Sequence, residues 1–291
     1  ILFAPLLFFP KIAFIAILLL VAIIFFNQKN YNENENQQKD IANIENNPGV
    51  NDLSNENILQ SPQTSQEESS TVVELRSIEG KWESTSAPPE CPDLIFYSPI
   101  DLSKATSVLY PGQDRNGYKP HGGFRFDKQT TNDIEVRAPF DGYAARGARY
   151  FAGGEIQYTV EIVNECGINH RLGHLLELSP EFNALAEKLP EPKELDSRLY
   201  QFENYIKVKK GDLIATKVGL DGNVFMDWGA YDLREENEAS QNSAYREEFS
   251  NMKDSAFYAL CWFDYLPENE EQIVRSLTAA DGKSGKNSDY C

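Results

Sequence analysis

The chain has 291 residues, of which 41% are hydrophobic and 12% aromatic, enough for one large or two modest domains with a buried core. Its formal net charge is -18, and it lacks the clusters of Lys and Arg that bind phosphate groups. These features exclude nucleic acid as a partner and disfavour an anionic membrane surface.

Residues 1–26 are almost wholly apolar, interrupted by Pro5, Pro10 and Lys11. The uncharged run 12–26 is shorter than the ~20 residues of an unassisted membrane span, although the residues before Lys11 extend it. A signal peptide and a signal anchor both fit this pattern. Because no small-residue cleavage motif follows, we predict an uncleaved transmembrane anchor over 1–26, with the membrane as a partner through this helix.

Residues 27–71 are rich in Asn, Gln, Glu and Ser and poor in aromatic side chains. Such a segment buries too little apolar surface to offset its chain entropy, so we predict a disordered linker. As a coil it reaches about 35 to 40 Å, enough to hold the next domain away from a membrane.

Four cysteines follow, at positions 91, 166, 261 and 291, and none forms a CxxC pair. An even number without metal-type spacing indicates disulfides and an extracytoplasmic location. We pair Cys261 with Cys291 and Cys91 with Cys166, although four cysteines permit three pairings.

Short β segments separated by Gly, Pro and Asp predict a mainly β domain over residues 72–234. A short strand is expected at 94–97, followed by β segments at 134–137, 171–175 and 208–215. Residues 154–163 alternate, which places four apolar side chains on one face of an extended strand: Ile156, Tyr158, Val160 and Ile162. The residues 166–169 are expected to form a hairpin turn.

Helical spacing appears in two places. Phe182, Leu185, Ala186 and Leu189 predict a helical insertion at about 180–199. Residues 235–291 are expected to form a helical C-terminal extension, with helical spacing over 245–266 and another short helix around 273–277.

The only histidines are His121, His170 and His174. Neutral imidazole is the usual nitrogen ligand of zinc and the usual base near neutral pH, so any hydrolytic zinc chemistry must use these residues. His121 lies in the Gly-rich stretch 120–127. We assign His170 to a turn, and take His174 either as a hydrogen-bonded, partly buried histidine or as an active-site group.

Four blocks occur in a fixed order: His121-x-Gly123, VRAPFDG at 136–142, RLGHL at 171–175 and VKKGDLI at 208–214. Together they resemble the lysostaphin-type (LytM-like) zinc metallopeptidases, whose domain contains the duplicated hybrid motif, and they cover about 119–234. The resemblance implies a compact antiparallel β-sheet or β-barrel-like domain. It also implies a bacterial cell envelope setting and a groove for peptidoglycan peptides.

The family holds zinc with the His and Asp of an HxxxD motif and the second His of an HxH motif, while a further His assists catalysis. By this resemblance His121 matches the first ligand and His174 the additional catalytic histidine. Arg125 stands at the Asp position, and a guanidinium cannot ligate zinc. Phe225 and Asp227 replace the two histidines of HxH, so His121 and Asp227 are residual metal positions.

Two arrangements of this region remain open. A ligand set of His121, Asp127 and Asp227 is chemically possible, but about 20 Å of extended strand separates residues 121 and 127. We therefore favour an ion pair between Arg125 and either Asp227 or Asp127 at the former metal position. Large rings nearby are expected to form core or groove wall: Phe124, Phe126, Trp228 and Tyr231.

The resulting hypothesis is a membrane-anchored envelope protein without a cofactor or catalytic activity. Its domain is expected to bind peptidoglycan, a peptide ligand or another envelope protein, which it would regulate. One alternative is an active zinc endopeptidase that cleaves peptidoglycan cross-bridges with an unusual ligand set. Another is a purely structural envelope scaffold.

Overall fold

The computed structural model describes residues 75–291, except 79–80, 85–88, 92–93, 116 and 281–286. These residues belong to one compact unit, Ser69–Cys291. The anchor expected at 1–26 and the linker expected at 27–71 lie outside the described residues. Within the described ranges, no helix combines the length and apolar character needed to cross a membrane.

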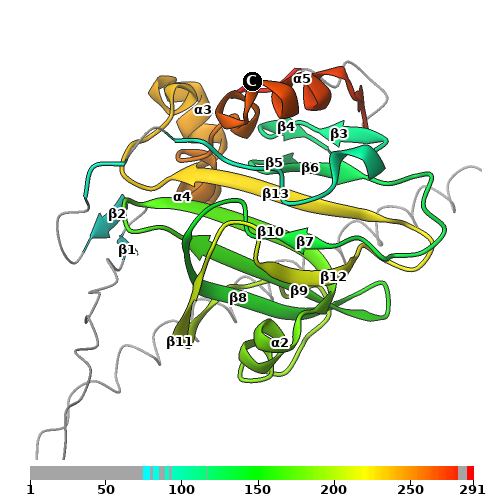
Figure 1. Ribbon diagram of the computed structural model, residues 1–291. Coiled ribbons are helices and arrows are strands. Elements are labelled where there is room, and N and C mark those ends of the chain that lie inside the picture. The colour runs from blue at the N-terminus through cyan, green and yellow to red at the C-terminus, as the bar shows by residue number, and fades with distance from the viewer. Residues whose placement is uncertain (1–74, 79–80, 85–88, 92–93, 116, 281–286) are drawn as a thin grey trace, which may run out of the picture. The chain divides into compact units, whose positions relative to one another are not determined.

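The described part of the chain is built on a ten-stranded sheet with the order β11-β8-β9-β10-β13-β6-β3-β14, in which β12 pairs with β10 and β7 (Figure 1). Every pairing in it is antiparallel except that of β14 with β3. This confirms a mainly β fold with an antiparallel sheet. The strands are β1 Leu75–Ile78, β2 Lys81–Ser84, β3 Ser107–Leu109, β4 Gln113–Asp114, β5 Tyr118–Lys119, β6 Gly122–Arg125, β7 Val136–Arg137, β8 Gly142–Ala152, β9 Glu155–Val163, β10 Ile168–Leu178, β11 Tyr200–Val208, β12 Leu213–Val218, β13 Phe225–Asp232 and β14 Thr278–Ala279.

The centre of the sheet contains the predicted strand, but the turn expected at 166–169 lies two residues earlier, because Ile168 and Asn169 already pair within β10. The alternating segment forms β9, and a turn at residues 164–167 connects it to β10. Gly153 and Gly154 join β8 to β9 with φ angles of 63° and 85°, a backbone region that favours glycine.

The strand expected at 94–97 is absent from this part of the structure. Phe96 and Tyr97 instead donate single backbone hydrogen bonds to Tyr265 and Pro139. The Phe96 ring is buried and stacks on Tyr265 with a centroid separation of 5.0 Å. The apolar run therefore reflects burial against the core and not ladder pairing.

The helices among the described residues are short. They are α2 Pro180–Ala186, α3 Ser243–Glu248, α4 Lys253–Ala256 and α5 Glu268–Ser276, with 3-10 turns η1 Leu102–Lys104, η2 Glu238–Gln241, η3 Ser250–Met252 and η4 Trp262–Tyr265. The helical insertion expected at about 180–199 is helical only in α2, because Pro190 and Pro192 prevent its continuation. The helical spacing at 245–266 is likewise divided among four short elements.

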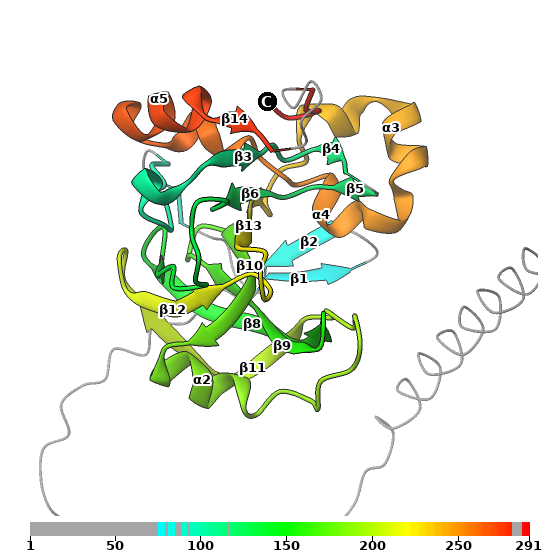
Figure 2. The same cartoon turned by 90° about the vertical axis from the view of Figure 1, so that its right-hand side faces the viewer.

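Two of the helices, α5 and α2, lie against different parts of the sheet. In Figures 1 and 2, α5 lies along the edge formed by β3 and β14, while α2 lies beside β8 and β10. Between the sheet and the C-terminal segment is an aromatic core that contains Phe124, Trp228, Trp262 and Phe263. Phe124, Phe126 and Trp228 are fully buried, as their assignment to core predicted.

Both expected disulfides are present. Cys91 bonds to Cys166 in the turn between β9 and β10, and Cys261 bonds to Cys291. Each bond ties a segment outside the central strands to the sheet or its aromatic cover.

Candidate functional site

His121 and Asp227 meet at the junction of β6 and β13. The antiparallel register pairs Gly123 with Asp227, and His121 Nε2 lies 3.0 Å from Asp227 Oδ2. Their side chains are 18% and 20% exposed. Gly123 permits this close approach, because its φ is 155° and an added Cβ would lie 2.1 Å from the Met226 carbonyl oxygen.

His174 reaches the same carboxylate from β10. A bulge interrupts the β10–β9 register between Leu172 and Leu175, and His174 has a φ of 57°. Bulges of this kind redirect side chains. His174 Nε2 consequently lies 3.5 Å from Asp227 Oδ2, with its ring beside Phe225. The structure thus brings together His121, His174 and Asp227, the three residues predicted for the site.

Gln157 orients His174 from the neighbouring strand. The Gln157 side chain is fully buried, donates from Nε2 to the Gly219 carbonyl oxygen at 2.9 Å, and presents Oε1 to His174 Nδ1 at 3.3 Å. With the amide nitrogen used on Gly219, this contact assigns the imidazole proton to Nδ1. Nε2 then faces Asp227 as an acceptor in the neutral ring.

Burial keeps His174 neutral. It is the largest effect on the pKa of His174 and lowers it; Asp227 raises this pKa, and the neighbouring His121, Arg171 and Lys119 lower it further. For Asp227, burial alone would raise the pKa, but the charge and hydrogen bond of His121 outweigh it, assisted by His174 and Arg115. The pKa of this carboxyl is held well below its usual range, so Asp227 is ionised at neutral pH.

Arg125 does not fill the space beside Asp227. Its Nε and Nη2 donate to Asp127 Oδ1 at 3.1 and 2.9 Å, and Nη2 also donates to Asn223 Oδ1 at 2.9 Å. Of the two partners predicted for Arg125, Asp127 is therefore correct and Asp227 is wrong. The loop between β12 and β13 supplies Asn223, which holds the guanidinium away from the cluster.

Asp127 lies apart from the cluster as well. It is half exposed and accepts from Thr106 Oγ1 at 2.8 Å in addition to Arg125. A ligand set of His121, Asp127 and Asp227 is therefore not assembled.

Two imidazoles and a carboxylate are donors that zinc accepts, but their arrangement does not suit it. The Nε2 atoms of both histidines lie next to one oxygen, Oδ2 of Asp227. Ligands of a zinc ion would instead be directed at a shared point between them, where the ion would lie. In the described ranges, no group of three His, Cys, Asp or Glu side chains is placed to hold a metal ion. The residues present do not fit a zinc ion in this conformation.

His170 is a core residue, so its assignment to a turn is wrong. It lies in β10, is fully buried, and accepts a hydrogen bond at Nδ1 from Trp228 Nε1 at 2.8 Å. Phe96 and Phe140 pack against its ring. Burial lowers the pKa of His170 to about 3, which removes it from chemistry near neutral pH.

A row of buried polar side chains continues from the cluster along the same sheet face. Cross-strand pairing aligns Gly173 with Asp227, Arg171 with Gly229 and with Glu161, and Asn169 with Tyr231. Because every second residue of a strand shares a face, these side chains adjoin the cluster. The missed signal was the polar half of the β9 alternation, at Gln157, Thr159 and Glu161, all of which are buried.

Comparison of the sequence with protein-family models and with curated proteins finds no match.

Proposed function

We propose that this chain is a membrane-anchored, extracytoplasmic envelope protein whose LytM-like domain is catalytically inactive and binds peptidoglycan peptides. The convergence of His121, His174 and Asp227 carries the proposal, because the sequence resemblance assigns metal-binding or catalytic roles to these three positions. The antiparallel sheet that assembles them is the kind of fold that the resemblance implies.

The arrangement favours binding over hydrolysis. Asp227 is engaged by His121 at 3.0 Å, and Arg125 replaces the carboxylate that the family uses for zinc. The three side chains nevertheless retain 18% to 24% of their surface exposed. They therefore offer one anionic acceptor and two imidazoles to a ligand, and peptide N–H and C=O groups are suitable partners for such groups.

The disulfides support an oxidising compartment, since structural disulfides persist outside the cytoplasm. A bacterial cell envelope satisfies this requirement and supplies the peptide ligand.

Retention of the full chain on insoluble peptidoglycan tests the proposal. We expect retention at moderate salt and severalfold weaker retention for Asp227→Asn, which removes the anionic acceptor while nearly preserving shape. Asp264→Asn is the matched control, because Asp264 pairs with Arg275 in the C-terminal segment. Absence of retention for the unmodified chain contradicts peptidoglycan binding and favours a structural scaffold.

The second candidate is a zinc endopeptidase that uses His121, His174 and Asp227. One observation favours it: Gln157 holds Nδ1 of His174, which leaves Nε2 as a free lone pair directed toward Asp227. Such outer contacts commonly fix the tautomer of a liganding histidine. The imidazoles would have to turn from the carboxylate onto a shared ion.

Metal analysis separates the two candidates. We expect substoichiometric zinc in the purified full chain and no release of soluble fragments from peptidoglycan. Stoichiometric zinc that disappears in His121→Ala, together with release of soluble fragments, would establish the peptidase instead. Retention of an envelope enzyme without retention on peptidoglycan would identify the ligand as that protein.

A further inference from the structure

We propose that a second site, a cavity lined by Arg171, Asn169 and Glu161, binds a carboxylate that carries a neighbouring N–H donor. This chemistry is shared by a free amino acid and by the C-terminal residue of a peptide. The peptide form of the ligand rests on the function proposed above, whereas the free amino acid does not.

The cavity lies on the sheet face that also bears Asp227. Arg171 is two residues before Gly173, the cross-strand partner of Asp227, and Asn169 is opposite Tyr231. The cavity has a volume of about 240 Å³, and Trp82 of β2 forms part of its wall. It is smaller than the pockets of drug-sized ligands, which begin at roughly 300 Å³, and so suits one or two amino-acid residues.

Arg171 supplies an uncommitted cation. Among the described residues its guanidinium has no ion pair or side-chain hydrogen bond, although it lies in the electrostatic field of Tyr150, Tyr231 and His174. Its cross-strand partner Glu161 instead forms an ion pair with Arg146, with Nη2 and Oε2 2.6 Å apart. Arginine presents a planar fork that matches a carboxylate bidentately, so a ligand carboxylate is the fitting partner.

Asn169 supplies an acceptor without a donor. Its side chain is only 3% exposed, and Oδ1 has no hydrogen-bond partner in the described structure. A buried acceptor left without a donor costs about 1 to 3 kcal/mol. A ligand N–H group in the cavity would donate to this oxygen. Because Asn169 and Arg171 are two residues apart on one face of β10, they fix the separation between the N–H group and the carboxylate of the ligand.

The charges that line the cavity balance each other, so they do not exclude a ligand carboxylate. The charged side chains around the cavity are Arg146, Arg171, Glu161 and Asp254, two cations and two anions. A free amino acid or a dipeptide, which carries one charge of each sign, therefore leaves the net charge of the site unchanged. This balanced lining differs from the chain as a whole, whose net charge of -18 disfavours the binding of anions.

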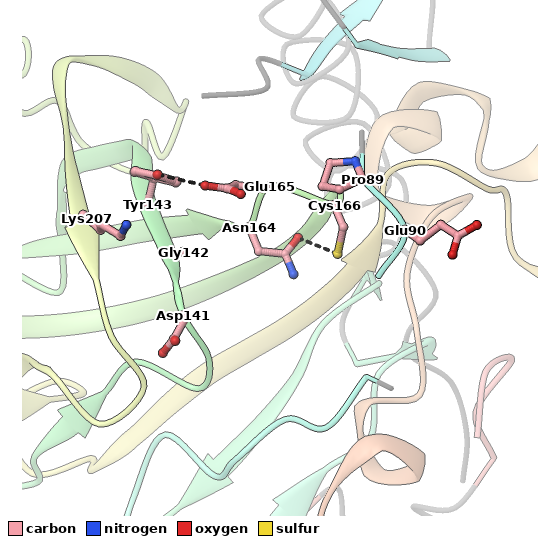
Figure 3. A pocket seen from close by; sticks show the side chains of 9 residues that line it. All are labelled: Pro89, Glu90, Asp141, Gly142, Tyr143, Asn164, Glu165, Cys166 and Lys207. Carbon is pink, nitrogen blue, oxygen red and sulfur yellow. Dashed lines mark hydrogen bonds between the residues drawn. The ribbon is translucent and has the colours of Figure 1, made fainter. Parts of the chain in front are cut away.

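Another cavity lacks these features. The pocket in Figure 3 has a volume of about 310 Å³ and adjoins the Cys91–Cys166 disulfide. Two of its polar side chains bond to each other, since Tyr143 Oη donates to Glu165 Oε1 at 3.0 Å. The ammonium group of Lys207 lies over the Tyr143 ring. No buried acceptor without a donor lines it among the described residues.

Isothermal titration of the full chain tests the proposal with four probes: alanine, alanyl-alanine, alanyl-alanine amide and acetate. We expect binding of alanine or alanyl-alanine in the millimolar range or tighter. The amide lacks the carboxylate and acetate lacks the N–H donor, so each is expected to bind at least about tenfold more weakly. Tighter binding of alanyl-alanine than of alanine identifies a peptide end, and the reverse identifies a free amino acid.

Variants locate the site. Arg171→Met should weaken binding about 10- to 100-fold, because it removes a charged hydrogen-bonding group, while Arg171→Lys should cause a smaller loss. Arg198→Met is the matched control, since Arg198 is exposed and pairs with Asp196. Asn169→Leu should weaken binding about tenfold without lowering the melting temperature, because it removes a buried acceptor that has no partner.

Three outcomes would overturn the proposal: no binding of any probe at millimolar concentration, equal binding of the amide, or unchanged affinity in folded Arg171→Met. The function proposed above fails separately, since peptidoglycan retention without dipeptide binding preserves it and removes only this site. Dipeptide binding without peptidoglycan retention would support this site and contradict the function proposed above.

Discussion

At the scale of single residues, the burial of His170 makes the stability of the fold depend on pH. Its ring is enclosed by Phe96, Phe140 and Trp228, and its Nε2 has no partner among the described residues. Charging this ring in an apolar environment is unfavourable, so its pKa falls from 6.5 to about 3. His170 is therefore a structural residue whose neutral state the fold requires.

Acid is expected to destabilise the protein through His170. Between about pH 6.5 and 3 the unfolded chain binds a proton at this position and the folded chain does not, so the free energy of unfolding falls as pH falls, by up to about 1.4 kcal/mol per pH unit. Urea denaturation from about pH 7 to pH 4, followed by tryptophan fluorescence, measures this slope. The lowered pKa of His174 contributes in the same direction.

His170→Gln isolates the effect. Its amide oxygen retains an acceptor for Trp228 but does not titrate, so the dependence on pH should be shallower than in the unmodified chain. His174→Gln serves as the control for the other lowered histidine. An unchanged slope in His170→Gln would show that other groups cause the acid sensitivity.

At the scale of elements, the contact between β6 and β13 positions the site. Gly123 lies so close to β13 that any side chain would collide with the Met226 carbonyl. This contact holds His121, which precedes β6, beside Asp227. The spacing of these strands is therefore a condition for the cluster to form.

Gly123→Ala is expected to lower the free energy of unfolding by about 3 kcal/mol or more, because backbone strain and a collision act together. Gly154→Ala is the matched control. Gly154 also has a positive φ, of 85°, but its added Cβ would meet nothing within 4 Å, so it should cost only about 1 to 2 kcal/mol. Equal losses in urea denaturation would mean that the β6–β13 approach is not restrictive.

Local patterns predicted the elements whose contacts are nearby in sequence. The apolar alternation at 156–162 located β9, and the turn expected after it at 166–169 lies two residues earlier, at 164–167. The three clustered residues, His121, His174 and Asp227, were named through the family resemblance, which aligned their sequence blocks with the family's zinc and catalytic positions. Their convergence follows from strand order, which local periodicity does not contain.

The unpredicted features depend on contacts between distant segments. The Arg125 guanidinium is held by Asp127 and also by Asn223, which is 98 residues away in the chain. The polar residues Gln157 and Glu161 were not singled out in the sequence, but they are buried in the row of polar side chains that continues from the cluster. Likewise, two prolines ended the expected insertion helix at α2 in spite of its apolar spacing.

At the scale of the whole described unit, two disulfides secure segments that have few strand pairings. Cys91 anchors the segment before η1 to the β9–β10 turn, and Cys291 anchors the C-terminal residues to the start of η4. Beside the second bond, Tyr290 Oη contacts the hydroxyl groups of Tyr245 at 2.7 Å and Tyr118 at 3.0 Å. The same bonds underlie the proposed extracytoplasmic location.

The two disulfides are expected to stabilise the fold unequally. They span 75 and 30 residues, and the loop-entropy relation assigns about 4.5 kcal/mol to the longer loop and about 3.6 kcal/mol to the shorter one. Urea denaturation of the paired Cys→Ser variants measures both losses, which should be largest for Cys91 with Cys166. Because reduction removes both constraints, native material should contain no free thiols and should unfold at lower urea after reduction. Free thiols at all four positions would contradict an oxidising compartment, and a larger loss for Cys261 with Cys291 would show that the tyrosine contacts, and not loop closure, set the contribution of that bond.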